Sequence, residues 1–196
     1  MLLNKKDDSE DYYSKHKTSV FSKKAIVILD AIQVGKSTLL KTLLKDTSNV
    51  LWLDAENADI SLIFENATAT RLKSFFGDNK FVVIDEAQKI DNIGSRLKLI
   101  TDHMPEIQVI ATGSSAFELR NQLNEPVTGR KFEHKLFALS FAEMQAHLGL
   151  LEEIRMLPHR LVYGYYPEVV TTQNNPEKIL RLLSDSILYK DRKSVV

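Results

Sequence analysis

The chain has 196 residues, with 26 basic and 26 acidic side chains, five histidines and no cysteine. Without cysteine it cannot contain a disulfide framework, a zinc ribbon or a cysteine nucleophile. Apolar residues make up 43% of the sequence, which is enough for the core of one domain with an appendage, or of one larger domain. Extensive disorder is therefore not expected.

The charges are spread evenly along the chain. In successive blocks of about 50 residues the net charge stays between −2 and +3, which does not support a dedicated nucleic-acid groove. Folding could still assemble a basic patch. No apolar run approaches the roughly 18–20 residues needed to span a membrane, and the charged residues that follow Leu3 do not fit a signal peptide. We therefore expect a cytoplasmic protein with no membrane segment.

Residues 1–22 are mostly polar and show no periodicity, which predicts a mobile or weakly helical lead-in. After them, short apolar segments alternate with helical patterns as far as residue 138. The predicted strands cover residues 25–29, 50–53, 81–84, 107–111 and, as a half-buried edge strand, 131–137. Trp52, in the second of them, is expected to lie in the core.

Helical patterns fill the intervals between these strands. The first begins at Lys36, and the second covers 62–76 and ends at Gly77. A third is predicted with Asp91 as its N-terminal cap, and a fourth covers 114–123. This alternation predicts an α/β domain with an open, mostly parallel sheet and helices on both faces. Its predicted limits are residues 23–138.

Only helical patterns follow this domain. They cover about 140–149, 152–163 and 176–190. Pro158 lies within the second of these patterns, Pro167 lies between the second and the third, and Pro176 begins the third. Ser140 and Glu143 have the spacing of a capping box, which predicts a helix start at this point. Residues 139–196 are therefore predicted to form a separate, short helical segment.

The residues with the clearest chemical meaning follow the first predicted strand, where the chain reads DAIQVGKST over 30–38. A phosphate-binding loop requires the pattern GxxxxGK[ST] between a buried strand and a helix. Gly35 lets backbone N–H groups approach a phosphate, Lys36 supplies a charge at the β- and γ-phosphates, and Ser37 offers a hydroxyl to Mg²⁺. The predicted contacts to ATP are Gln33, Val34, Gly35, Lys36, Ser37 and Thr38.

Two later strand ends carry polar residues. The third predicted strand ends in Asp85 and Glu86, which could hold Mg²⁺ through water and polarise an attacking water, respectively. The alternative is an acidic pair at a helix start. The fourth ends in Thr112 and Ser114, which would lie beside the phosphate loop at the crevice of an open sheet. The alternative is a plain turn in which Ser114 caps a helix.

Taken together, these residues resemble the prokaryotic AAA+-type P-loop ATPases, in which an ATPase domain precedes a C-terminal domain of unknown function. The resemblance extends from about residue 25 to 191 and keeps the family order. It rests on the stretches VGKSTLLKTLL, VLWLDAEN, FVVIDEAQKI, VIATGSS, GRKFEHKLFALSFAEM, YGYYPEVV and SILYKD.

The resemblance implies a P-loop NTPase fold of the AAA+/ASCE type, with a five-stranded core in the spatial order 5-1-4-3-2. It implies that Lys36 and Ser37 belong to Walker A, that Asp85 and Glu86 belong to Walker B, and that Thr112 or Ser114 is a sensor. Arg130, in a family-like Gly129-Arg130 pair, would be an arginine finger. The alternative for Arg130 is a surface side chain on the edge strand.

The chain departs from the family pattern in two places. Asp30, Ala31 and Ile32 replace the Gly, Pro and Arg of a loop that usually reads GPRQVGKT, so Walker A is expected to be weakened. The sequence also ends soon after the SILYKD stretch. We therefore expect residues 139–196 to be the start of a truncated, winged-helix-like C-terminal domain.

Three functions remain open from the sequence. The first is an ATPase domain that binds Mg-ATP, hydrolyses it slowly and so drives a conformational change in an attached domain or partner protein. A finger arginine from a neighbouring protomer would then imply a homo-oligomer. The second is a nucleic-acid translocase, suggested by DEAQ over 85–88 but opposed by the even charge and the missing second motor lobe. The third is a degenerate interaction module in which Asp30 has disabled the loop.

Overall fold

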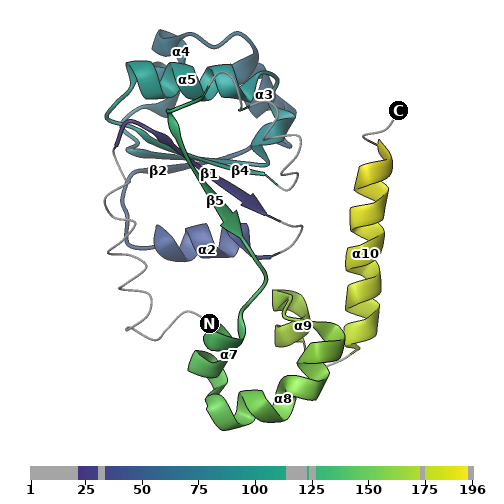
Figure 1. Ribbon diagram of the computed structural model, residues 1–196. Helices are drawn as coiled ribbons and strands as arrows, with labels where there is room; N and C mark the ends of the chain where they lie inside the picture. The colour runs from purple at the N-terminus through teal and green to yellow at the C-terminus, as the bar shows by residue number, and fades with distance from the viewer. Residues whose placement is uncertain (1–21, 31–33, 114–122, 124–126, 173–174, 194–196) are drawn as a thin grey trace. The chain divides into compact units, whose positions relative to one another are not determined.

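The computed structural model describes residues 22–30, 34–113, 123, 127–172 and 175–193, without the side chains of Asp30 and of residues 187–193. The chain forms two compact units. One contains the sheet and, among the described residues, covers 22–30 and 36–136; the other contains Val34, Gly35 and the described residues from Phe137 onward (Figure 1). The predicted lead-in and the predicted helix over 114–123 lie outside the described residues, apart from Ser22 and Leu123.

The sheet has five parallel strands in the order β2-β3-β4-β1-β5. Their bounds are β1 (Ala25–Asp30), β2 (Val50–Asp54), β3 (Phe81–Asp85), β4 (Gln108–Gly113) and β5 (Lys131–Leu136). All five predicted strands are present, and the order implied by the family resemblance is confirmed. The fold is therefore the predicted α/β fold.

Helices cover both faces of this sheet (Figure 1). Helix α2 (Lys36–Leu43) lies on one face, and α3 (Ala58–Glu65), α4 (Ala69–Phe76) and α5 (Ile93–His103) lie on the other. The helical pattern over 62–76 belongs to two helices, because Thr68 Oγ1 accepts a hydrogen bond from the N–H of Arg71 and caps the second one. The predicted cap at Asp91 is wrong. Helix α5 follows Asn92, which has a left-handed backbone (φ 54°).

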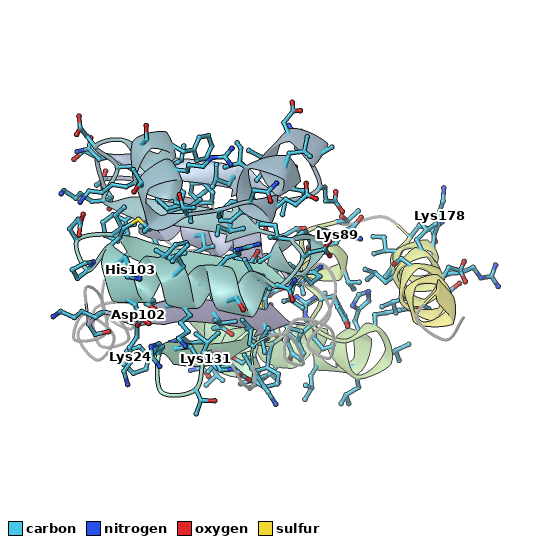
Figure 2. The ribbon with its side chains drawn as sticks, turned by 90° about the horizontal axis from the view of Figure 1, so that it is seen from above. Lys24, Lys89, Asp102, His103, Lys131 and Lys178 are labelled. Carbon is cyan, nitrogen blue, oxygen red and sulfur yellow. The ribbon has the colours of Figure 1, made fainter. Side chains whose placement is uncertain are left out.

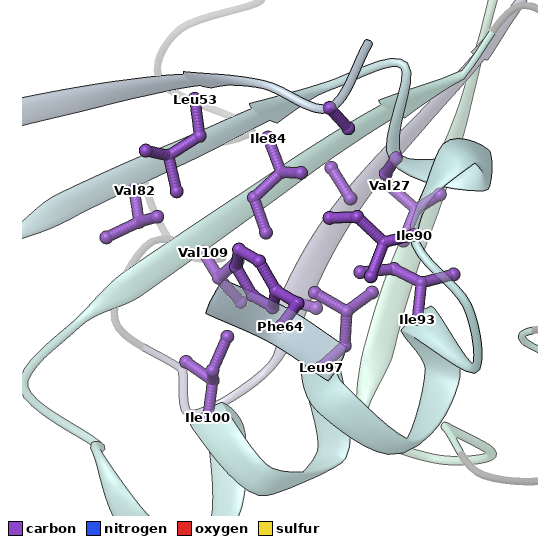
Figure 3. Packing of buried hydrophobic residues seen from close by; sticks show 14 of the residues in the cluster. Val27, Leu53, Phe64, Val82, Ile84, Ile90, Ile93, Leu97, Ile100 and Val109 are labelled. Atoms are coloured by element: carbon purple, nitrogen blue, oxygen red, sulfur yellow. The ribbon is translucent and has the colours of Figure 1, made fainter. Parts of the chain in front are cut away.

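Alternating strand residues build two hydrophobic clusters. Val27, Val82, Ile84 and Val109 point toward α3–α5 and pack with buried residues of those helices, among them Phe64 and Leu97 (Figure 3). Ile28, Val83 and Ile110 form the smaller cluster with Leu40 of α2. The central strands are therefore buried on both faces, which fixes the positions of their carboxyl ends.

The prediction that Trp52 lies in the core is wrong, since 39% of its surface is exposed. The sheet order explains this result. Strand β2 is an edge strand, with β3 as its only neighbour among the strands that the structure describes. An apolar residue on an edge strand has sheet neighbours on one side only, so its side chain is less completely covered.

The second unit consists of α7 (Phe141–Leu148), α8 (Leu150–Tyr163), α9 (Pro167–Thr171) and α10 (Pro176–Lys193). The predicted capping box is confirmed, because Ser140 and Glu143 exchange both of its hydrogen bonds. Helix α8 contains Pro158, as does the helical pattern predicted over 152–163, and α9 was not predicted. The winged-helix-like character of this unit stays a prediction.

A buried ion pair lies within the second unit. Glu153 and Arg160 have 0% and 4% of their surface exposed, and Glu153 Oε1 lies 3.4 Å from Arg160 Nε. The hydroxyl of Tyr165 donates a second contact to the same oxygen at 2.9 Å. Burial, together with this hydrogen bond to the carboxylate, raises the pKa of Tyr165 above its usual value.

No helix in the described part of the chain is both long and apolar enough to cross a bilayer.

Candidate functional site

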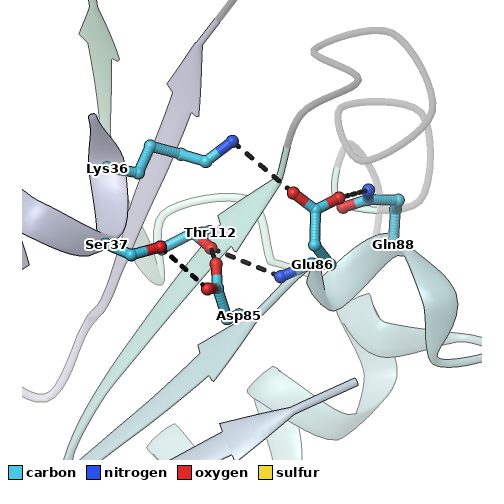
Figure 4. Close-up of polar contacts among 6 residues, drawn as sticks. All are labelled: Lys36, Ser37, Asp85, Glu86, Gln88 and Thr112. Atoms are coloured by element: carbon cyan, nitrogen blue, oxygen red, sulfur yellow. Dashed lines mark hydrogen bonds and ion pairs between the residues drawn. The ribbon is translucent and has the colours of Figure 1, made fainter. Parts of the chain in front are cut away.

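The predicted site residues come from elements that meet at one edge of the sheet. Strands β3 and β4 are parallel neighbours, so Asp85 and Thr112 lie near the same end of the sheet. Helix α2 follows β1, the next strand in the order, and begins at Lys36. Segments that are distant in the sequence therefore bring their polar side chains together (Figure 4).

Asp85 is held by two hydroxyl groups. Ser37 Oγ donates a hydrogen bond to Asp85 Oδ2 at 3.0 Å, and Thr112 Oγ1 donates a short one to Asp85 Oδ1 (Figure 4). These two contacts fix the orientation of the carboxylate. One hydroxyl and one carboxylate oxygen at this spacing fit the ligand preference of Mg²⁺, which takes one or two protein oxygens and completes its shell with water and phosphate.

Lys36 and Glu86 form an ion pair beside this contact. Lys36 is 7% exposed, and its Nζ lies 3.7 Å from Glu86 Oε1. Glu86 has a left-handed backbone (φ 50°, ψ 42°), and its N–H donates to Thr112 Oγ1 at 3.3 Å. A left-handed backbone is uncommon outside glycine, so the chain turns sharply immediately after β3. The turn places the Glu86 carboxylate toward α2.

Gly35 lies directly before α2 and has φ 96°. A Cβ atom added at Gly35 would meet nothing within 4 Å, so backbone conformation rather than space favours glycine here. Val34 is buried, whereas Thr38 is exposed on the first turn of α2. The N–H groups in the first turn of a helix are directed toward its N-terminal end, so those of α2 are directed toward the end at which a phosphate would bind.

Some predicted residues cannot be placed. Gln33 and Ser114 lie outside the described residues, as does the side chain of Asp30. The backbone of Asp30 is described: it ends β1 and pairs in register with Leu136 of β5. A paired strand residue does not require the backbone freedom of glycine. Any effect of Asp30 on a phosphate would therefore come from its side chain and charge.

Arg130 lies at the opposite end of the sheet. Its carbonyl accepts a hydrogen bond from Ala25 N at the start of β1, and its Nε lies 2.7 Å from Asp102 Oδ1. Figure 2 shows Asp102, Lys24 and Lys131 at one end of the sheet unit, and Lys89, which follows Glu86 closely, at the other. Arg130 therefore does not join Lys36, Asp85 and Glu86 within one chain.

One residue of the site was missed from the sequence. Gln88 Nε2 donates a hydrogen bond to Glu86 Oε2 at 2.5 Å (Figure 4). Its only signal in the sequence is the last residue of DEAQ over 85–88, a stretch that also resembles a helicase motif. Residues two apart do not face each other in an α-helix, and here the turn after β3 brings the two side chains together.

The sheet order, together with a helix that begins at Lys36 beside the ends of β3 and β4, defines the fold of a P-loop NTPase. A sequence model of the AAA domain family matches residues 22–145, and the chain belongs to this family. It thus contains an AAA-type P-loop ATPase domain.

Solved structures share the fold at low sequence identity. The Walker-type ATPase PABY2304 of Pyrococcus abyssi has a TM-score of 0.58 and 15% identity, over 100% of this chain and 79% of that protein. The RuvB Holliday junction branch migration motor of Thermotoga maritima has a TM-score of 0.47 and 13% identity, over 81% and 56%. No curated protein matches the sequence.

Proposed function

We propose that this chain binds ATP with Mg²⁺ and hydrolyses it slowly, and that hydrolysis drives a conformational change in an attached domain or partner. The observation that carries the proposal is the meeting of Lys36, Ser37, Asp85 and Glu86 at one edge of the sheet. A chance GKS triplet would have no reason to lie within hydrogen-bond distance of a strand-terminal Asp-Glu pair. These four side chains also have the chemistry that phosphoryl transfer requires.

Each side chain has a distinct role in this proposal. Lys36 would bind the β- and γ-phosphates, and the backbone of residues 33–38 would surround them. Ser37 would hold Mg²⁺ directly and Asp85 would hold it through water; the bound ion would neutralise charge on the phosphates. Glu86 would accept a hydrogen bond from the attacking water and so orient it. Thr112 would serve as the sensor, since it touches both Asp85 and the backbone of Glu86.

Two features support weak binding of ATP, and hence a low rate of hydrolysis at subsaturating ATP. Lys36 is already paired with Glu86, so phosphate binding must replace an existing ion pair. Asp30 adds a negative charge at the start of the loop that receives the phosphates. Both features weaken the interaction between ATP and the protein without removing any of the four central side chains.

The position of Arg130 fits a role in the site of a neighbouring copy rather than in the site of its own chain. Because it lies at the end of the sheet away from Glu86, it could act as an arginine finger only in the site of a neighbouring copy. Its bond to Asp102 would hold the guanidinium at the surface in a defined position. We therefore include a homo-oligomer in the proposal.

Isothermal titration with ATP, with and without Mg²⁺, tests the proposal most directly. We expect saturable binding that strengthens with Mg²⁺ and is followed by phosphate release at a low rate. Undetectable binding at millimolar ATP would favour the degenerate interaction module instead. Salt-dependent binding to single-stranded DNA, measured on the same protein, would favour the translocase.

A further inference from the structure

Gln88 lies on a short turn that the core holds firmly. The 3-10 helix η2 (Ala87–Lys89) follows Glu86 directly, and the N–H of Lys89 donates to the carbonyl of Glu86 at 2.9 Å. Ala87 and Ile90, on either side of Gln88, are 0% and 1% exposed and belong to the main hydrophobic cluster. The backbone that carries Gln88 is therefore anchored at two points.

The amide of Gln88 reaches back to the carboxylate of Glu86. Gln88 Nε2 donates to Glu86 Oε2 at 2.5 Å, whereas Glu86 Oε1 faces Lys36 Nζ at 3.7 Å (Figure 4). The two oxygens thus have different partners on different elements, η2 and α2. A glutamate side chain has several rotatable bonds, and its free rotation must be restricted before one oxygen can face a fixed point.

We infer that Gln88 is a positioning residue for ATP hydrolysis, which holds Glu86 Oε2 so that Oε1 stays directed at the attacking water. The inference rests on the proposed function. Lys36 would leave Glu86 for the phosphates when ATP binds, and Glu86 would then lose its contact on the α2 side. The bond to Gln88 does not involve Lys36 and would remain, so the carboxylate would keep its orientation at the moment of reaction.

A positioning role predicts a loss of turnover without a loss of binding. In the Gln88→Met variant the side chain keeps a similar length but has no amide donor. We expect kcat to fall by about 10-fold to 100-fold, because a misplaced catalytic group costs rate. The KM for ATP and the dissociation constant from titration should stay within about twofold of the parent, since Gln88 would not touch the phosphates. Gln145→Met, an exposed glutamine on α7, is the matched control and should leave kcat unchanged.

A double-mutant cycle separates positioning from a structural role. In the Glu86→Gln background there is no carboxylate left to orient, so adding Gln88→Met should lower the residual kcat no further. An equal loss in both backgrounds would overturn the inference, as would an unchanged kcat in Gln88→Met alone. Thermal unfolding of each variant should match its parent; if Gln88→Met does not fold, Gln88→Asn, whose shorter amide cannot reach Glu86, replaces it and should show the same loss.

The ATPase activity of the parent protein separates a failure of the proposed function from a failure of the inference about Gln88. If the parent neither binds nor hydrolyses ATP, the proposed function fails and the inference fails with it. If the parent hydrolyses ATP and Gln88→Met does so at the same rate, the proposed function stands and only the role of Gln88 is overturned.

Discussion

Lys36 Nζ and Glu86 Oε1 lie 3.7 Å apart, so the cation at the start of α2 and the carboxylate that follows β3 are paired with each other. Their side chains are 8% and 21% exposed, which makes the pair less screened than one on the surface. A phosphate that binds at α2 would have to compete with Glu86 for Lys36. The two residues are therefore expected to respond to mutation in opposite ways.

Lys36→Ala should abolish ATP binding, because it removes the positive charge at the proposed phosphate site and leaves the loop backbone in place. Lys41→Ala provides the matched control, since Lys41 is exposed in the last turn of the same helix. Titration calorimetry of both variants measures the effect. Parent-like affinity in Lys36→Ala would refute the assignment of residues 30–38 as a phosphate loop.

Glu86→Gln should suppress phosphate release while preserving ATP binding. Glutamine is nearly isosteric with glutamate but cannot accept a proton as a carboxylate does. Because the substitution also releases Lys36 from its ion pair, we expect ATP to bind about twofold to fivefold more tightly, in line with about 0.5–1 kcal/mol for such a pair. Equal rates of phosphate release in the two proteins would remove Glu86 from the mechanism.

Asp30→Gly should tighten ATP binding. At 4 Å from a phosphate oxygen, a carboxylate is repelled by about 1 kcal/mol per charge pair in water-like surroundings and by about 4 kcal/mol at an effective dielectric near 20. Rotation toward solvent or pairing with a lysine reduces this repulsion, so we expect a gain of about 5-fold to 50-fold. The gain should shrink as salt rises. Titration of both proteins at two ionic strengths measures it, and no gain at low salt would show that Asp30 does not face the phosphates.

Arg130→Ala should lower phosphate release at protein concentrations where the chain self-associates, and should leave ATP affinity nearly unchanged. The reason is that Arg130 lies away from Glu86 of its own chain and could reach only a neighbour's site. Arg155→Ala is the control, because the Arg155 side chain is 75% exposed on α8. In mixtures, Glu86→Gln and Arg130→Ala proteins should restore activity to each other. An unchanged rate in Arg130→Ala would leave it as a surface residue paired with Asp102.

Amide hydrogens of α7–α9 should exchange faster than those of β1, β3 and β4. The second unit has a small core: its hydrophobic cluster has Val169, Ile179 and Leu183 as buried members, and Met144 of α7 is a further buried apolar residue among those described. Helix α8 also exposes large apolar side chains, among them Leu151 (75%) and Leu161 (79%). Local opening therefore costs less free energy there than in the sheet. Hydrogen exchange measured by mass spectrometry gives the comparison, and slower exchange in α7–α9 would indicate a self-sufficient fold.

The sequence was sufficient to predict a strand or a helix start wherever the interactions that form it lie within a few residues. Continuous β-branched runs predicted the central strands, because a strand buried on both faces has no polar side to display. The spacing of Ser140 and Glu143 predicted a helix start, because both hydrogen bonds of a capping box lie within four residues. Where several local solutions compete, the prediction failed: the chain enters α5 through a left-handed Asn92 rather than with a cap at Asp91.

Local patterns alone thus determined the strands, the helix starts at Lys36 and after Ser140, and the types of chemical group available. The tertiary structure decided which of these groups meet. Ser37 and Asp85 are separated by 48 residues and come within 3.0 Å only because β1, β4 and β3 are adjacent and parallel. The same strand order leaves Trp52 on an edge strand, and the parallel direction of the strands places Arg130, before β5, and Glu86, after β3, at opposite ends of the sheet. Pairing between strands depends on crossover connections and on packing against both faces, and neither is encoded in any short stretch of residues.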